Sequence, residues 1–406
     1  MYLRGVGQPI EVHTRIIGRI TDNPIDEGME RADHILLVGN EGVPAPEQCV
    51  GYAGFLSSKE PHSLPQAPAP GVYGIRQLGY LTTGDVVLLL PGGSVNVLYR
   101  RSSLHNTILT TERCNSLCLM CSQPPRLEDD SYRVEEILRL IELIDPLSAE
   151  IGLSGGEPTL LGTHFLKIVE KFRDFLPCTR LHILTNGRLF KDLPFARALG
   201  RIGHPALMLG IPLYSDIDWM HDYVVQAPGA FDETVQGLYN LAGCGVRIEI
   251  RVVVHAQTHQ RLPQLADYVS WNLPFVDHVA LMGMEMFGFV HRNLATLWID
   301  PVDYQAELER TTLTLAMRGF DVSIYNHQLC TLPKSLWPFA RKSISDWKNV
   351  YLDACHDCGV RDFCGGFFQS GTKKHSRAIR AQSTPSKELA QALQSLQPAR
   401  EDLEPV

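Results

Sequence analysis

The chain has 406 residues, and its net charge of −8 does not favour a broad surface for nucleic acids or anionic membranes. Hydrophobic residues make up 44% of the chain, as in an ordinary globular protein, and no apolar run is long enough to span a bilayer. The first residues, 1–7, lack the apolar core of a signal peptide. We therefore expect a cytoplasmic protein, with no nucleic-acid partner and no membrane association.

The first 104 residues are predicted to form a β-rich region. Short apolar runs at 35–38 and 86–90 are flanked by glycine, and residues 95–99 alternate with the period of a strand. Four prolines between positions 61 and 70 predict a loop. This region contains no motif of known chemistry.

From residue 105 to residue 290, strand-like and helix-like segments alternate. This pattern predicts an α/β fold in which parallel strands are covered by helices, with functional groups at the carboxyl ends of the strands. The expected strands are 108–111, 151–153, 181–185, 206–213, 246–254 and 276–282. The expected helices are 134–144, 165–175, 231–241 and 262–271. A third region, 291–375, carries a second cysteine group, and the polar residues 376–406 are expected to form a flexible tail.

Three cysteines with the spacing Cys-x3-Cys-x2-Cys directly follow the first of these strands: Cys114, Cys118 and Cys121. A loop there can wrap three thiolates, the usual ligands of iron–sulfur clusters, around one cluster. Three protein ligands leave one iron open for reaction. The alternative is a structural zinc site, but zinc usually takes four close ligands and no histidine follows the strand nearby.

Other motifs follow the later strands. Residues 154–158, Ser-Gly-Gly-Glu-Pro, place two glycines where backbone can approach a ligand, and residues 185–187, Thr-Asn-Gly, form a turn signal. Arg251 puts a charge inside an apolar strand, which is costly unless the charge is paired. Its partner is either a carboxylate ligand or a protein carboxylate such as Glu249.

The second cysteine group has four members and predicts a closed metal site, with iron–sulfur and zinc as the two candidates. Its members are Cys330, Cys355, Cys358 and Cys364.

The first cysteine spacing, followed by Gly-Gly-Glu after the second strand, resembles the radical S-adenosylmethionine (SAM) superfamily. The resemblance implies a partial (β/α)6 barrel and a [4Fe–4S] cluster whose open iron binds SAM, which is cleaved to a 5′-deoxyadenosyl radical. Met120 stands where the family often has an aromatic residue, and Pro212 stands where peptide-modifying relatives often have a serine, so Ser215 is considered in its place. The implied SAM contacts are Met120, Ser154, Gly155, Gly156, Glu157, Thr185, Asn186, Ser215 and Arg251.

The spacing Cys355-x2-Cys358-x5-Cys364 resembles a shortened SPASM or twitch-like region and implies an auxiliary [4Fe–4S] cluster. This spacing, taken together with the sequences of residues 120–125, 282–288 and 325–333, resembles the radical SAM maturase of the His-Xaa-Ser system. That system has a pair of radical SAM proteins, and the resemblance is to the C member of the pair. That resemblance implies a ribosomally made peptide substrate, a second radical SAM partner protein and an external electron donor.

Two alternatives remain open from the sequence. One is a radical SAM enzyme that acts on a small metabolite, and the other is a non-catalytic scaffold stabilised by zinc or carrying electrons. The N-terminal β region is a candidate for peptide recognition by strand addition at a sheet edge, or for a structural lid.

Overall fold

The structure is a computed structural model, and it describes residues 4–25, 31–38, 49–63, 68–342, 350–386, 391 and 393. The predicted loop at 61–70 lies partly outside these residues, because 64–67 are not described. None of the described helices is both long and apolar enough to cross a membrane.

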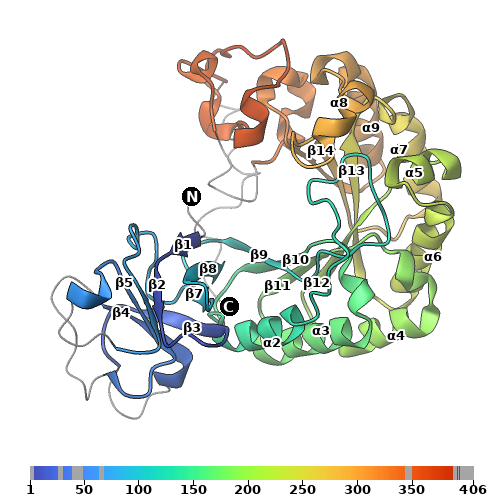
Figure 1. The fold of residues 1–406 in the computed structure, drawn as a ribbon. Helices are drawn as coiled ribbons and strands as arrows, with labels where there is room; N and C mark the ends of the chain where they lie inside the picture. The colour runs from blue at the N-terminus through green and yellow to red at the C-terminus, as the bar shows by residue number, and fades with distance from the viewer. Residues whose placement is uncertain are drawn as a thin grey trace.

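A curved sheet of parallel strands forms the centre of the molecule (Figure 1). Every neighbouring pair is parallel, and the spatial order follows the chain order. This confirms the predicted α/β fold. In the described residues its strands are β9 (His105–Leu109), β10 (Glu150–Ser154), β11 (Arg180–Leu184), β12 (Leu207–Pro212), β13 (Arg247–Val254), β14 (His278–Gly283) and β15 (Asp321–Tyr325).

Helices cover the outer face of this sheet (Figure 1). Each is amphipathic: in α3, for example, Phe165, Ile168, Val169 and Phe172 recur at helical spacing, and all four are buried. The helices are α2 (Arg133–Leu143), α3 (Thr163–Phe175), α4 (Leu193–Ile202), α5 (Asp218–Val225), α6 (Ala230–Gly243), α7 (Leu262–Asn272), α8 (Val290–Leu297) and α9 (Gln305–Met317).

Alternation along each strand separates two environments. On β13, Ile248, Ile250 and Val252 belong to the core under the helices, so Glu249 and Arg251 point to the opposite, concave face. The inner face of the barrel therefore carries polar side chains, and the carboxyl ends of the strands open toward one rim.

Strand β15 was not predicted. It pairs with β14 and adds a seventh parallel strand to the six expected ones. Of its five residues, only Val322 and Ile324 are buried aliphatic residues. The alternate positions Ser323 and Tyr325 are polar or aromatic, so the apolar pattern in the sequence is short.

The N-terminal region forms a second sheet whose order is β1-β8-β7-β3-β4-β5-β6-β2 in the described residues. Only Gly7 separates β1 from β2 in the chain, although they lie at the two ends of the sheet, so one segment joins both ends. Such closure removes free edges, which disfavours strand addition there. The strands are β1 (Arg4–Val6), β2 (Gln8–Ile10), β3 (Ile16–Thr21), β4 (His34–Val38), β5 (Gly54–Ser57), β6 (Gly71–Tyr73), β7 (Val86–Leu89) and β8 (Ser94–Tyr99).

We predict that Gly7→Ala opens this closure. A Cβ at Gly7 would lie 2.2 Å from the carbonyl oxygen of Tyr73, so the backbone must shift, and overpacking of this kind costs about 1–3 kcal/mol. Amide hydrogen exchange in β6 and β8 should accelerate. Gly79→Ala is the matched control, because nothing lies within 4 Å of its Cβ position. Equal exchange in both variants contradicts the prediction.

The segment expected to be a flexible tail begins with ordered contacts. The backbone N–H of Arg377 and the hydroxyl of Ser376 donate to Asp300, and the N–H of Gln382 donates to the sulfur of Cys358 at 3.4 Å. Residues 376–382 thus pack beside the second cysteine group.

Candidate functional site

The loop with Cys114, Cys118 and Cys121 follows β9 at the carboxyl end of the parallel sheet, as predicted. It is joined to the turn after β10, because the N–H of Gly156 donates to the carbonyl of Thr111 at 2.7 Å and that of Glu157 to the carbonyl of Arg113 at 2.8 Å. Two consecutive hydrogen bonds fix the loop against the Gly-Gly-Glu turn.

Neighbouring elements hold the rest of the loop. Arg188 donates to the carbonyl of Asn115 at 2.6 Å and to the hydroxyl of Ser116 at 3.1 Å, and is itself held by Glu233 at 2.7 Å. The N–H groups of Leu117 and Leu119 donate to carbonyls at the end of α5. The sequence analysis missed Arg188, since its partners lie more than 70 positions away along the chain and no motif connects them.

The three thiols lie close together in a shielded environment. Burial raises the pKa of Cys118 to about 12, and the nearby Cys121 and Cys114 thiols raise it further. Burial also raises the pKa of Cys114 to about 11. The Cys121 thiol donates to the carbonyl of Gln123 at 3.0 Å. Although no three His, Cys, Asp or Glu side chains of the described residues are grouped closely enough for a single metal ion, three neighbouring thiols are a donor set that fits an iron–sulfur cluster with one open iron.

Both positions of the turn require glycine, because the backbone of the cysteine loop lies very close to them. Gly155 has a φ of 144°, which L side chains rarely adopt, and its Cβ position is 2.3 Å from the carbonyl oxygen of Thr111. A Cβ on Gly156 would lie 2.0 Å from the carbonyl oxygen of Arg113, directly before Cys114.

We predict that Gly156→Ala prevents assembly of the first site. The added methyl group must push the loop away from the turn and displace Cys114, so the chain should lose about four of about eight iron atoms when both sites hold [4Fe–4S] clusters. Iron and sulfide determination after reconstitution measures this. Gly243→Ala, with nothing within 4 Å of its Cβ position, is the control. Full iron in Gly156→Ala would refute the prediction.

Glu157 is completely buried and joins two turns. Its carboxylate accepts from the backbone N–H and hydroxyl of Thr159, from the hydroxyl of Thr185 at 2.6 Å and from the N–H of Asn186 at 2.6 Å. Burial raises the pKa of this carboxyl, while these hydrogen bonds lower it. In the structure Glu157 therefore orients the turn.

Two further predicted residues meet at the same rim. The side-chain amide of Asn186 donates to the side chain of Asn115 at 2.6 Å, which connects the turn after β11 to the cysteine loop. Ser154 accepts from the N–H and the hydroxyl of Thr110 through its carbonyl. The motifs after β9, β10 and β11 thus form one hydrogen-bonded assembly.

Met120 and Ser215 occupy buried positions. Met120 belongs to an apolar cluster with Tyr214, Val225 and Met286. Ser215 is fully buried, and its hydroxyl accepts from the N–H of Ile217 at 3.2 Å, within its own turn.

Tyr214 is a site residue that the sequence did not single out. Burial raises its pKa, the charges of Cys118 and Cys121 raise it further, and that of Arg251 lowers it. Its ring packs in the apolar cluster that contains Met120 of the cysteine loop. The indication that the sequence offered for Tyr214 as a site residue was its position directly after Pro212-Leu213, at the end of β12.

Arg251 is paired within the barrel. It donates to the carboxylate of Glu249 at 2.5 Å and to the sulfur of Met282 at 3.2 Å. Glu249 also bonds His278 at 2.7 Å, and His182 lies 3.4 Å away. Although burial opposes ionisation, these partners hold the pKa of Glu249 far below its usual value. The protein carboxylate expected as one candidate partner of Arg251 is therefore Glu249.

The four cysteines of the second group also converge. Burial raises the pKa of Cys364 to about 11, with further contributions from Cys330 and Cys355, and burial together with Cys355 and Cys358 raises that of Cys330. Backbone N–H groups approach two of the sulfurs: Gly366 donates to Cys364 at 3.5 Å, as Gln382 does to Cys358. Such donors are typical of sulfurs that ligate clusters.

Comparisons with solved structures give partial similarities. SuiB of Streptococcus suis bound to S-adenosylmethionine is 17% identical with a TM-score of 0.43, over 56% of this chain and 51% of SuiB. The anSMEcpe structure with AdoMet and the Cp18Cys peptide is 17% identical with a TM-score of 0.41, over 54% of this chain and 62% of that one. A radical SAM methyltransferase from Sphaerobacter thermophilus is 16% identical with a TM-score of 0.41, over 59% and 72%.

The chain spans about half the length of the SuiB structures it resembles. These TM-scores lie below 0.5, so they assign no substrate. No curated protein matches the chain. Residues 108–269, from β9 through most of α7, match the family described as Radical SAM superfamily. The chain is therefore similar to that superfamily over these residues, which include the cysteine loop and the Gly-Gly-Glu turn.

Proposed function

We propose that this enzyme modifies a ribosomally synthesised peptide of the His-Xaa-Ser repeat type in the cytoplasm, by hydrogen abstraction. The observation that carries the radical chemistry is the convergence of Cys114, Cys118 and Cys121 against the Gly-Gly-Glu turn at the carboxyl rim of the sheet. The peptide assignment is supported by the motif resemblance described above. A second radical SAM protein and an external electron donor are the proposed partners.

The chain's own residues would hold the cofactors as follows. Cys114, Cys118 and Cys121 would bind a [4Fe–4S] cluster, which when reduced and bound to SAM supplies the electron that yields the 5′-deoxyadenosyl radical. Gly155 and Gly156 allow the turn to lie close against the carbonyls of Thr111 and Arg113 in the cysteine loop. The remaining proposed contacts to SAM are Met120, Ser154, Glu157, Thr185, Asn186, Ser215 and Arg251.

Arg251 and Glu249 together would orient the SAM carboxylate. Arg251 already gives one donor to Glu249, which fixes the plane of its guanidinium, and its other nitrogen contacts only the weak acceptor Met282. A carboxylate is a stronger acceptor than a thioether and would replace that contact.

Cys330, Cys355, Cys358 and Cys364 would bind an auxiliary [4Fe–4S] cluster. Among the described residues, no three His, Cys, Asp or Glu side chains are grouped closely enough for a single metal ion. The resemblance of the spacing of these cysteines to a shortened SPASM or twitch-like region supports iron–sulfur, with zinc as the alternative.

The test is co-expression of the enzyme with a His-Xaa-Ser repeat peptide, followed by mass spectrometry. We expect a mass change on the peptide that is absent with Cys118→Ala. An unmodified peptide alongside enzyme that cleaves SAM would instead favour a small-metabolite substrate.

A further inference from the structure

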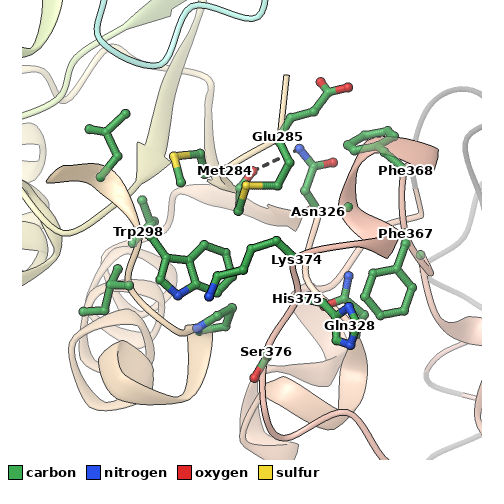
Figure 2. A pocket seen from close by; sticks show the side chains of 18 of the residues that line it. Met284, Glu285, Trp298, Asn326, Gln328, Phe367, Phe368, Lys374, His375 and Ser376 are labelled. Carbon is green, nitrogen blue, oxygen red and sulfur yellow. Dashed lines mark hydrogen bonds between the residues drawn. The ribbon is translucent and has the colours of Figure 1, made fainter. Parts of the chain in front are cut away.

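A pocket lies between the loop after β14 and residues 365–376 (Figure 2). One wall, Met284 to Met286, follows β14, and Met286 packs in the same apolar cluster as Met120 of the first cysteine loop. The opposite wall, 365–368, directly follows Cys364. A ligand in this pocket would be held beside both cysteine sites.

The pocket contains one cation on an aromatic face. The ammonium of Lys374 lies 4.6 Å from the centre of the Trp298 ring, and Figure 2 shows the lysine chain extended beside the indole. None of the ion pairs formed by the described residues includes Lys374, and the carboxylate of Glu285, in the same pocket, points away from it (Figure 2). A lysine ammonium has three donors and no acceptor. A cation–π contact leaves these donors available.

The rest of the lining is largely apolar. Met284, Trp298 and Phe367 present thioether and aromatic surface. The side-chain amide of Asn326 donates to the carbonyl of Gly283, and that of Gln328 donates to the carbonyl of Gly366. Lys374 itself is exposed, so its ammonium over the indole face is accessible to an anion that enters the pocket. The planar anion that peptides carry is the carboxylate.

The geometry points to a carboxylate subsite formed by Lys374 and Trp298, which binds an acidic side chain or the C-terminal carboxylate of the peptide substrate with apolar neighbours against Met284 and Phe367. This inference rests on the proposed peptide substrate. It adds a recognition element at a defined place: acidic and apolar residues of the peptide enter the pocket between the loop after β14 and residues 365–376.

The test measures binding to anaerobically purified, cluster-loaded enzyme without reductant or SAM. The probes are acetylated pentapeptides Leu-Ala-X-Ala-Phe: Glu at X with an amidated end, Gln at X with an amidated end, and Gln at X with a free C-terminus. We expect tighter binding of the peptides that carry a carboxylate. The relative affinities of these peptides show whether the subsite binds a side-chain carboxylate or the C-terminal carboxylate.

Lys374→Met should weaken binding of the preferred carboxylate peptide about threefold, as expected for an exposed ion pair, and leave the Gln amide unchanged. Lys373→Met is the matched control, because the neighbouring lysine is also exposed but does not line the pocket. Glu285→Gln should leave binding equal or tighter, because it removes a like charge from the pocket. Loss of binding in Glu285→Gln, or equal losses in the two lysine variants, overturns the inference.

Carbodiimide coupling gives an independent readout. It joins a bound carboxylate to a contacting amine as an amide with loss of water, and peptide mass mapping locates the bond. We expect the bond at Lys374 in preference to Lys373, and even coupling to both overturns the subsite. Since neither measurement involves SAM cleavage, failure here is distinguishable from failure of the proposed function.

Discussion

Replacement of Cys118 by alanine is expected to remove about four of about eight iron atoms per chain and to abolish SAM cleavage. Cys118 is the middle ligand of the loop, and its backbone carbonyl also accepts from the N–H of Cys121 at 3.0 Å. With two thiolates left, two irons of the cluster would have no protein ligand. Iron, sulfide and the electron paramagnetic resonance spectrum of the reduced protein measure the loss.

Two controls separate this effect from general damage. Cys178→Ala removes an exposed cysteine outside both groups and should keep all iron. Cys358→Ala should also lose about four irons, from the second site, while the remaining signal still changes when SAM is added. If Cys118→Ala kept its full iron content and its response to SAM, the assignment of the first site would be wrong.

Replacement of Glu249 by glutamine is expected to destabilise the barrel by about 3–5 kcal/mol, because it breaks a buried ion pair and leaves one partner uncompensated. The Glu249 side chain is 6% exposed, and Arg251 and His278 both bond to it. The melting temperature of the barrel, from scanning calorimetry, reports the loss. Glu135→Gln is the control, since Glu135 pairs with Lys167 on the surface at 3.9 Å and such pairs contribute at most about 1 kcal/mol.

The same pair predicts a pH dependence. The folded-state pKa of Glu249 is lowered, so its stabilisation is complete above the unfolded value of about 4.3 and is lost as the pH falls below it. The stability difference between wild type and Glu249→Gln should therefore shrink in acid. Arg251, His182 and His278 face this carboxylate. If the stability difference between wild type and Glu249→Gln grows on acidification, the ion pair between Glu249 and Arg251 is contradicted.

The parallel sheet could be predicted from the sequence because the hydrophobic residues of its strands and helices recur with clear periodicity. The alternation of β13 and the helical spacing of α3 follow directly from buried aliphatic positions. The strand expected at 206–213 corresponds to β12, which ends at Pro212. Strand β15 was missed because its inward positions carry polar groups, which weakens the apolar pattern.

The candidate site could be predicted only where its residues share a motif. The cysteine loop and the Gly-Gly-Glu turn were found from local spacing. The contacts of Arg188 and Asn186 with the loop were not, because they join segments about 70 residues apart through side-chain hydrogen bonds. The closure of the N-terminal sheet at Gly7 depends on strand register, which the sequence pattern does not encode.

The most direct test of the account is formation of 5′-deoxyadenosine. Reconstituted wild-type protein, kept anaerobic and mixed with SAM and a strong reductant, should produce 5′-deoxyadenosine detectable by liquid chromatography with mass spectrometry. Production should require the reductant and should be absent in Cys118→Ala. Protein with its full complement of iron and sulfide that forms no 5′-deoxyadenosine would contradict the assignment of a SAM-cleaving site to Cys114, Cys118 and Cys121.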